Sequence, residues 1–413
     1  MMKHLTKRLL ILLLVVSLSF SLVGCFADKL FGNTTDTSSD NKNDQSEKKE
    51  PKPYTVAYVT DYSNIKNIIF IIGDGMGEEQ LNAGELFAGK DFAFRDSFNL
   101  LYSDTNSLNS STDEPTETTD SAAGATALAT GHLTYNKKIA MGKTLSDVYD
   151  TFLDLAKSVG KSTAVVTTDY LSGATPACFT AHASNRSMTY DIIRSQAKSG
   201  VDLLIGQYEK TYDECESDIV ENYNYCKTFD RDAILSKKNE DTLCLFNMEK
   251  ETSDSVELKE ATELAIDYLK DDTDGFVLVI EQAHIDKKAS DGDFEGMAKT
   301  SNSLNDTVEA ALNFAKDRND TAIIVTADHE TGGLKTSSDP DEYSNKCTNA
   351  DGDTFSYEFA TTNHTQTNVP IYFTGFGLKP ELMATYSSSE KMKNCEIFLM
   401  VKDLVLHGAM VTE

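Results

Sequence analysis

The pattern of apolar and polar positions after about residue 56 predicts buried strands that alternate with helices. Continuous apolar runs, rich in β-branched residues, occupy residues 67–72, 163–168, 276–280, 322–326 and 369–373. Each run is short, and the first is ended by Gly73-Asp74-Gly75. Runs of this kind are typical of strands in a sheet that is covered on both faces.

Between these runs, apolar residues recur at helical spacing. One stripe consists of Leu145, Val148, Phe152, Leu155 and Val159, and Gly160 ends it. A second stripe consists of Leu304, Val308, Leu312 and Ala315. Strands and helices in alternation predict an α/β fold, which we expect to be a three-layer α/β/α sandwich around a mostly parallel central sheet.

The first 25 residues have the pattern of an export signal. Lys3, Lys7 and Arg8 precede an apolar run over residues 9–23, which is too short for a comfortable membrane span. The run ends in Leu-Val-Gly-Cys, which is similar to the bacterial lipobox. We therefore expect cleavage before Cys25, lipidation of its thiol and anchoring to the outer face of the cell membrane. An ordinary cleaved signal with a chance cysteine is the alternative.

The remaining chain divides into a tether and one catalytic domain. Residues 26–55 are mostly polar and predict a flexible tether, because they cannot bury a core. Residues 56–413 then form the folded domain. Within it, residues 208–251 show little periodicity and are rich in tyrosine and cysteine, so we expect a peripheral insertion there.

Six cysteines follow Cys25, and none forms a CxxC pair, which argues against a thiolate zinc site. Export permits disulfides. Cys215 and Cys226 are close enough in sequence to pair, although spacing alone does not determine the connectivity. Free, reduced cysteines are the alternative.

The formal net charge of -28 limits the classes of partner. Non-specific nucleic-acid binding needs a basic surface, so no nucleic-acid partner is expected. An acidic surface serves solubility, and some of the carboxylates are candidates to hold metal cations.

Polar residues follow several of the predicted strands. Asp74, Glu281 and the pair Asp328-His329 each come at or directly after a strand end. Ligands of open α/β sheets bind beyond the carboxyl ends of the strands. Carboxylates and an imidazole that converge there form the ligand pattern of a metal site.

A run of very small residues follows Thr119-Asp120-Ser121 and extends to Ala127. It predicts a closely packed helix with Ser121 at its N-terminus, where free N–H groups and the helix dipole favour negative charge. Such a position would stabilise a serine alkoxide and receive a phosphoryl group. The alternative is a serine that only caps the helix.

Four segments together resemble the alkaline phosphatase family: Gly73-Asp-Gly-Met-Gly77, Thr119 to Ala127, Glu281 to Lys287, and Thr326 to Gly333. The resemblance covers about residues 65 to 410. It implies a phosphomonoesterase with two Zn²⁺ and one Mg²⁺, a phosphoserine intermediate, small phosphomonoester substrates and, in many family members, a homodimer.

The resemblance also implies a role for individual residues. Ser121 would be the nucleophile, and Arg186 would clamp the phosphate, with Asp120 and Lys287 as further substrate-binding residues. The metal ligands would be Asp74, Asp328 and His329 for one zinc, Asp286 and His364 for the other, and Asp74, Thr175 and Glu281 for magnesium.

Two positions depart from the family pattern. The family usually has a histidine four residues after the position of Asp286, where this chain has Ser290. Asp291 or Asp293 could replace that ligand, whereas nearby His284 is expected to be a packing residue. Gly173, two residues before Thr175, offers no side chain where family members often carry aspartate or histidine.

Two other functions compete with this one. The first is a two-metal phosphodiesterase or a sulfatase-like relative, although the chain lacks the Cys/Ser-x-Pro-x-Arg segment of sulfatases. The second is a non-catalytic, phosphate-binding surface lipoprotein, for which only Ser290 argues.

Overall fold

The computed structural model describes residues 59–60, 64–249, 252, 254–388 and 391–407. Residues 57–413 form one compact unit. The predicted export signal, Cys25 and the tether lie outside the described residues. Within the described ranges, we find no helix with the length and hydrophobicity that a membrane span requires.

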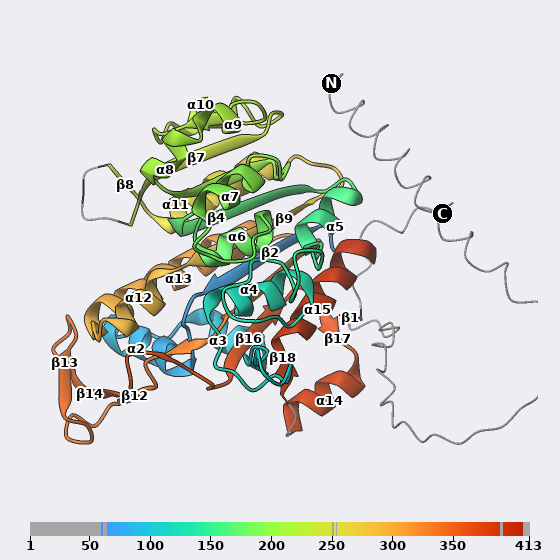
Figure 1. The fold of residues 1–413 in the computed structure, drawn as a ribbon. Coiled ribbons are helices and arrows are strands. Elements are labelled where there is room, and N and C mark those ends of the chain that lie inside the picture. Colours follow the sequence, from blue (N-terminus) through green and yellow to red (C-terminus); the bar gives the residue numbers. More distant parts are fainter. Residues whose placement is uncertain (1–58, 61–63, 250–251, 253, 389–390, 408–413) are drawn as a thin grey trace, which may run out of the picture. The chain divides into compact units, whose positions relative to one another are not determined.

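A large mixed sheet forms the centre of this unit (Figure 1). It has eleven strands, and the main path runs in this order: β18 (Met392–Lys393), β3 (Asn99–Asp104), β16 (Val369–Thr374), β10 (Thr321–Thr326), β2 (Asn67–Gly73), β9 (Phe276–Gln282), β4 (Ser162–Tyr170), β5 (Leu203–Gln207), β7 (Thr242–Met248) and β6 (Asn224–Cys226). Strand β8 (Ser255–Val256) pairs with β7. From β10 to β6 every pairing is parallel, whereas β16 runs antiparallel to both β10 and β3.

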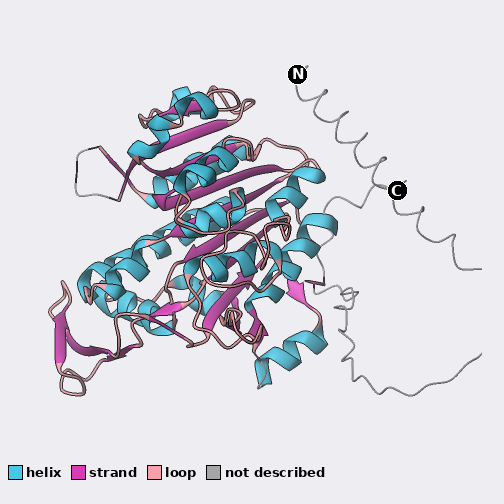
Figure 2. Cartoon of the chain, in the orientation of Figure 1, coloured by secondary structure: helices cyan, strands magenta, loops and turns pink. Residues whose placement is uncertain are grey.

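Helices cover both faces of the sheet (Figure 2). In β2, Ile68, Phe70 and Ile72 pack into one hydrophobic core, and Ile69 and Ile71 pack into the other. The first core includes residues of α4 (Ser121–Thr130), α5 (Phe152–Ser158), α6 (Ala174–Thr180), α7 (Thr189–Gln196) and α15 (Asn394–His407). The second includes residues of α2 (Glu78–Ala88), α3 (Ala93–Ser97), α11 (Leu258–Leu269), α12 (His284–Ser290) and α13 (Phe294–Ala315). The predicted three-layer sandwich and all five predicted strands are confirmed, because each apolar run lies between two buried cores.

Smaller elements surround the sheet. Strands β12 (Leu334–Ser337), β14 (Thr354–Phe359) and β13 (Asn345–Thr348) form a separate sheet, and β1 (Val59–Thr60) pairs with β17 (Gly377–Leu378). The remaining helices are α8 (Lys210–Glu214), α9 (Glu216–Ile219), α10 (Arg231–Leu235) and α14 (Pro380–Ser388). Strand β11 (Glu330–Thr331) pairs with β15 (His364–Thr365), and this pairing sets His364 opposite Thr331 beside the central sheet.

One of the two predicted helices is shorter than its apolar stripe. The stripe from Leu304 to Ala315 lies on α13, as predicted. The helix predicted from the stripe that begins at Leu145 is wrong in its first half. Helix α5 starts only at Phe152, and Leu145 and Val148 are 75% and 50% exposed. Thr151 caps α5 through the backbone N–H of Asp154, and the chain before it is paired back on residues 140–142.

The described part of the segment 208–251, residues 208–249, lies at one edge of the central sheet. It contains α8, α9 and α10, but its strands β6 and β7 continue the sheet beyond β5. The register of these strands places Cys226 opposite Cys244, and the two form a disulfide. The pairing of Cys215 with Cys226 that we considered from the sequence is therefore wrong, and Cys215 is a buried free cysteine.

Candidate functional site

The carboxyl ends of three neighbouring strands place the predicted polar residues together. β2 lies between β10 and β9, and all three are parallel. Asp74 follows β2, Glu281 lies near the end of β9, and Asp328 and His329 follow β10. All four side chains are buried, at the sheet edge where α/β folds bind ligands.

Two groups of potential metal ligands lie at this edge. In the first, the ligand atoms of Asp74, Asp328 and His329 are within 4.8 Å of one another, and in the second those of Asp286, His329 and His364 are. His329 Nε2 lies 3.3 Å from Asp74 Oδ1 and 3.4 Å from Asp328 Oδ2. His364 Nε2 lies 3.3 Å from Asp286 Oδ1, and the two imidazole rings stack with centroids 3.6 Å apart.

Unsatisfied polar atoms indicate that this site fits metal cations. Seven buried side-chain polar atoms of the described residues make no hydrogen bond, and three of them are Asp74 Oδ1, Asp328 Oδ2 and Thr175 Oγ1. Buried polar atoms almost always have a hydrogen-bond partner, and exceptions require an explanation. These three atoms belong to residues for which the family resemblance implies a role in metal binding. Thr175 lies in the first turn of α6, and Glu281 is buried with the Thr167 hydroxyl hydrogen-bonded to it.

The electrostatics of the site agree with that conclusion. Burial, and then repulsion by neighbouring carboxylates, raises the pKa of Asp74 well above its ordinary value. The same two causes raise the pKa of Asp328 to about 7 and that of Glu281 to about 8. Burial and the nearby His364 lower the pKa of His329 to about 3, so its ring is neutral at physiological pH. Closely packed carboxylates and a neutral imidazole are what a bound cation requires.

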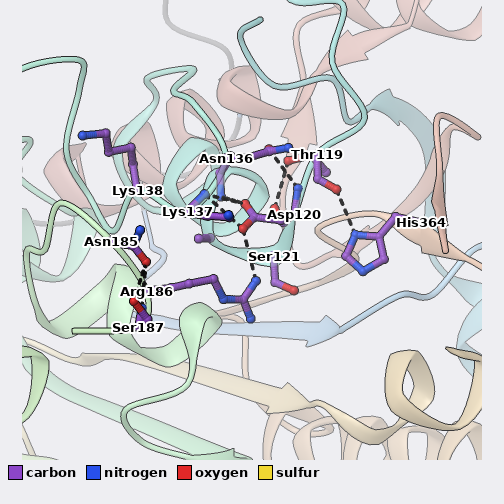
Figure 3. Close-up of polar contacts among 12 residues, drawn as sticks. Thr119, Asp120, Ser121, Asn136, Lys137, Lys138, Asn185, Arg186, Ser187 and His364 are labelled. Carbon is purple, nitrogen blue, oxygen red and sulfur yellow. Dashed lines mark hydrogen bonds and ion pairs between the residues drawn. The ribbon is translucent and has the colours of Figure 1, made fainter. Parts of the chain in front are cut away.

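His364 is oriented by a backbone carbonyl. Its Nδ1 donates to the carbonyl oxygen of Thr119, 2.8 Å away (Figure 3). This leaves Nε2 beside Asp286 Oδ1, at 3.3 Å. Burial opposes protonation, but the hydrogen bond and charge of Asp286 raise the pKa of His364. The hydroxyl of Thr331, which sequence reasoning missed, also hydrogen-bonds Asp286. Pairing of β11 with β15 brings this threonine into place.

Ser121 is the first residue of α4 and is buried. It does not cap the helix, because Asp120 does so by accepting from the N–H of Ala123 at 3.0 Å. The alternative of a merely capping serine is therefore excluded. Ser121 Oγ lies 3.3 Å from His329 Nε2, beside the first group of ligands. The small residues of α4 permit this approach: a Cβ added to Gly124 would lie only 2.8 Å from the carbonyl oxygen of Asp328.

Asp120 also holds Arg186 beside Ser121. Arg186 Nη1 lies 3.3 Å from Asp120 Oδ2, and Figure 3 shows the guanidinium next to Ser121. The backbone N–H of Arg186 donates to the carbonyl of Lys137, whose own N–H donates to the Asp120 carboxylate. Because these contacts occupy the carboxylate of Asp120, it positions Arg186 and α4 in this structure.

The structure brings neither proposed substitute for the missing histidine to Asp286. Asp293 caps α13 through Gly296 and pairs with Lys288 at 2.8 Å. Asp291 lies at the C-terminal end of α12, and neither aspartate belongs to the two ligand groups among the described residues. His284 Nδ1 lies 4.0 Å from Glu249, outside both groups as well.

Asp169 is a second residue that sequence reasoning missed. Its carboxylate accepts from Lys287 Nζ at 2.5 Å, and its charge is second to burial in raising the pKa of Glu281. Asp169 lies at the carboxyl end of β4, beside β9. The rule that singled out Asp74 and Glu281, a polar residue at a strand end, would also have found it.

Comparison with known proteins finds similarity to alkaline phosphatases. The family model described as Alkaline phosphatase matches residues 65–210 and 227–396. Alkaline phosphatase 3 of Bacillus subtilis is 33% identical over 294 residues, which are 67% of this chain and 63% of that protein. Alkaline phosphatase of Escherichia coli is 29% identical over 333 residues, or 64% and 70% of the two chains. This chain thus spans less than two thirds of the length of the Bacillus protein.

Solved structures give the same result for the fold. The alkaline phosphatase from the Antarctic bacterium TAB5 superimposes with a TM-score of 0.70 at 27% identity, covering 83% of this chain and 98% of that one. The alkaline phosphatase of Thermus thermophilus superimposes with a TM-score of 0.68 at 16% identity. The superposition covers 82% of this chain and 91% of the Thermus chain.

Proposed function

This chain belongs to the alkaline phosphatase family, as its motifs indicated, and we propose that it hydrolyses phosphomonoesters with Ser121 as the phosphate acceptor. One observation carries the proposal. Ser121 lies at the N-terminus of α4, 3.3 Å from the neutral ring of His329, next to buried carboxylate oxygens that make no hydrogen bond. This is where a nucleophilic oxygen would meet a phosphate and its cations.

Two zinc ions and one magnesium ion are the cofactors that the ligand chemistry supports. Asp74, Asp328 and His329 would hold one zinc, Asp286 and His364 the other, and Asp74, Thr175 and Glu281 the magnesium. When bound, such cations favour deprotonation of the serine and of water, and they neutralise charge on the phosphate and on the leaving oxygen. Two structures of TAB5 alkaline phosphatase variants contain Mg in a site called M3, which supports a magnesium requirement here.

Ser121 takes part in both displacements, as the nucleophile in the first and as the leaving group in the second. Its Oγ loses a proton to solvent and attacks phosphorus, and the bond from phosphorus to the ester oxygen breaks, which releases an alcohol after protonation. A water oxygen then attacks the phosphoserine, the bond from phosphorus to Oγ breaks, Ser121 regains a proton and inorganic phosphate leaves. The N-terminus of α4 favours the negative charge that gathers at Oγ in both steps.

Arg186 and Lys287 supply fixed positive charge at the phosphate site. The guanidinium of Arg186, held by Asp120, presents two parallel N–H donors to the non-bridging phosphate oxygens. Lys287 extends from α12, one residue after Asp286, and adds a second charge at the same edge of the sheet. A trigonal-bipyramidal phosphate is thus met by donors that need no reorganisation during the reaction.

The test uses residues 57–413 as well as the full chain, with zinc and magnesium added. We expect hydrolysis of p-nitrophenyl phosphate to exceed that of bis(p-nitrophenyl) phosphate, loss of activity on chelation and recovery with zinc and magnesium. Faster hydrolysis of the diester would favour the phosphodiesterase alternative. Tight phosphate binding without turnover of either ester, in metal-loaded protein, would favour the non-catalytic lipoprotein.

The N-terminal sequence motivates a further part of the proposal. We infer that the chain is exported and attached to the membrane through a lipid on Cys25, so that phosphate is released outside the cytoplasm. Fractionation of cells that express the full chain should find the protein with membranes, and Cys25→Ala should release it. Membrane association that persists in that variant would refute the anchor. Light scattering of the purified protein tests whether it forms the homodimer common in the family.

A further inference from the structure

The space beside Gly173 is filled by a carboxylate from another part of the chain. Gly173 is the N-cap of α6 and lies two residues before Thr175. An ideal Cβ at Gly173 would lie 2.8 Å from Asp169 Oδ2 and 2.8 Å from the carbonyl oxygen of Tyr170. A side chain at position 173 and the present position of Asp169 are therefore mutually exclusive.

Asp169 contacts the groups on either side of the proposed magnesium ligands. Its Oδ1 accepts from Lys287 Nζ at 2.5 Å, while Oδ2 faces Gly173. Its backbone N–H donates to Thr167 Oγ1 at 2.8 Å, and that hydroxyl donates in turn to the Glu281 carboxylate. The carboxylate of Asp169 thus lies between the turn that carries Thr175, the strand that carries Glu281 and the lysine of the phosphate site.

We propose that Asp169 is a positioning residue that supplies, from β4, the carboxylate that position 173 lacks, and so stabilises the bound magnesium while holding Lys287. This inference rests on the proposed function of the same site. Magnesium keeps several of its waters when bound to proteins, and a carboxylate beside the ligands accepts hydrogen bonds from them. The same negative charge attracts both the cation and the ammonium of Lys287.

A simple surface ion pair is the competing explanation. The side chains of Asp169 and Lys287 are 21% and 46% exposed, and ion pairs that solvent reaches contribute little to stability. If the pair served stability alone, removal of the Asp169 charge would leave magnesium affinity unchanged. The experiment therefore measures binding rather than turnover.

The decisive variant is Asp169→Asn, compared with Asp293→Asn. The control removes a carboxylate that pairs with Lys288, the neighbour of Lys287 in α12, and asparagine remains a good N-cap for α13. Magnesium is titrated calorimetrically into zinc-loaded protein. We expect Asp169→Asn to weaken magnesium binding about tenfold or more, the range found for partners of metal ligands, while the control binds as the parent does. Unchanged affinity in Asp169→Asn overturns the inference.

Lys287→Met separates the carboxylate from the ion pair. It retains Asp169 and removes the ammonium, so magnesium should bind at least as tightly as in the parent. Equal weakening in Lys287→Met and Asp169→Asn would mean that the pair only holds the local structure, and would overturn the inference. If Asp169→Asn lowers the melting temperature of the zinc-loaded, magnesium-free protein more than the control does, Asp169→Glu must restore magnesium affinity for the inference to stand.

Phosphate inhibition gives a second measurement at the same site. Asp169→Asn and Lys287→Met should each weaken inhibition by inorganic phosphate, and the double variant should be no worse than Lys287→Met alone, because Asp169 acts through Lys287. Additive effects would contradict that connection. Turnover tests the proposed function, whereas magnesium affinity tests the role of Asp169. If the metal-loaded parent does not turn over phosphomonoesters but Asp169→Asn still weakens magnesium binding, the proposed function fails and the role of Asp169 in magnesium binding stands.

Discussion

The close contact between Gly124 and Asp328 makes Gly124→Ala a test of how finely Ser121 is placed. Gly124 lies one turn after Ser121 in α4, and the added methyl carbon would lie 2.8 Å from the carbonyl oxygen of Asp328 and 3.2 Å from its Cβ. Ordinary contacts begin near 3.4 Å, so α4 and the segment with Asp328 and His329 must separate by about 0.6 Å.

This separation predicts a loss of activity larger than the loss of stability. A displacement of about 1 Å can reduce a rate by about 10²-fold, so we expect kcat to fall roughly tenfold as Ser121 moves from His329. Alanine improves helix propensity by up to about 1 kcal/mol, whereas overpacking costs about 1–3 kcal/mol. The variant should therefore remain folded at assay temperature.

Gly84→Ala provides a matched control for overpacking. Gly84 lies in α2, in the layer that packs on the other face of the sheet, where the added carbon would lie 2.8 Å from the ring of Phe92 and 2.9 Å from Ser301 Cβ. The assay compares kcat on p-nitrophenyl phosphate at saturating zinc and magnesium with the melting temperature of each variant. Parental kcat in Gly124→Ala, or an equal loss of kcat in Gly84→Ala, would refute the reasoning.

Three further predictions concern the metal and phosphate sites. Ser290→His places an imidazole one helical turn after Asp286, and we expect zinc affinity at that site to rise about tenfold or more; zinc titration against a chromogenic chelator measures this, and equal affinity would mean that another residue already completes the site. Arg186→Ala should weaken inhibition by phosphate about tenfold or more through loss of its charge-assisted hydrogen bonds, and unchanged inhibition would place the clamp elsewhere. The pKa values of Asp328, about 7, and Glu281, about 8, lie above their unfolded values, so their favourable contribution to stability is complete in acid and is lost as pH rises through this range. The melting temperature of metal-free protein should therefore fall relative to that of metal-loaded protein between about pH 4 and 8, and parallel curves would contradict these shifts.

Much of the site could be predicted because it follows from strand position. A sheet buried on both faces needs continuous apolar strands, and the ends of those strands place Asp74, Glu281 and Asp328 side by side. The stripe beginning at Leu145 misled us, because apolar spacing does not reveal that a capping residue at Thr151 starts the helix.

Strand position alone would have singled out Asp169, but the contacts that Asp169 and Thr331 make could not be predicted, because they join segments distant in sequence. The roles of Asp169 and Thr331 depend on the packing of β4 and β11 against α12, and the Cys226–Cys244 disulfide depends on the register of two edge strands. The position of Asp293 soon after Asp286 makes it a candidate ligand, but its carboxylate is used as the N-cap of α13.

The most direct measurement is to trap the phosphorylated protein. Zinc- and magnesium-loaded protein is incubated with radiolabelled phosphate, quenched in acid and mapped by peptide mass spectrometry, alongside Ser121→Ala. The account predicts label on Ser121 in the parent, and no label and little turnover in Ser121→Ala, which should keep its fold and zinc content. Label on a different residue, or undiminished turnover in Ser121→Ala, would contradict the assignment of Ser121 as the phosphate acceptor.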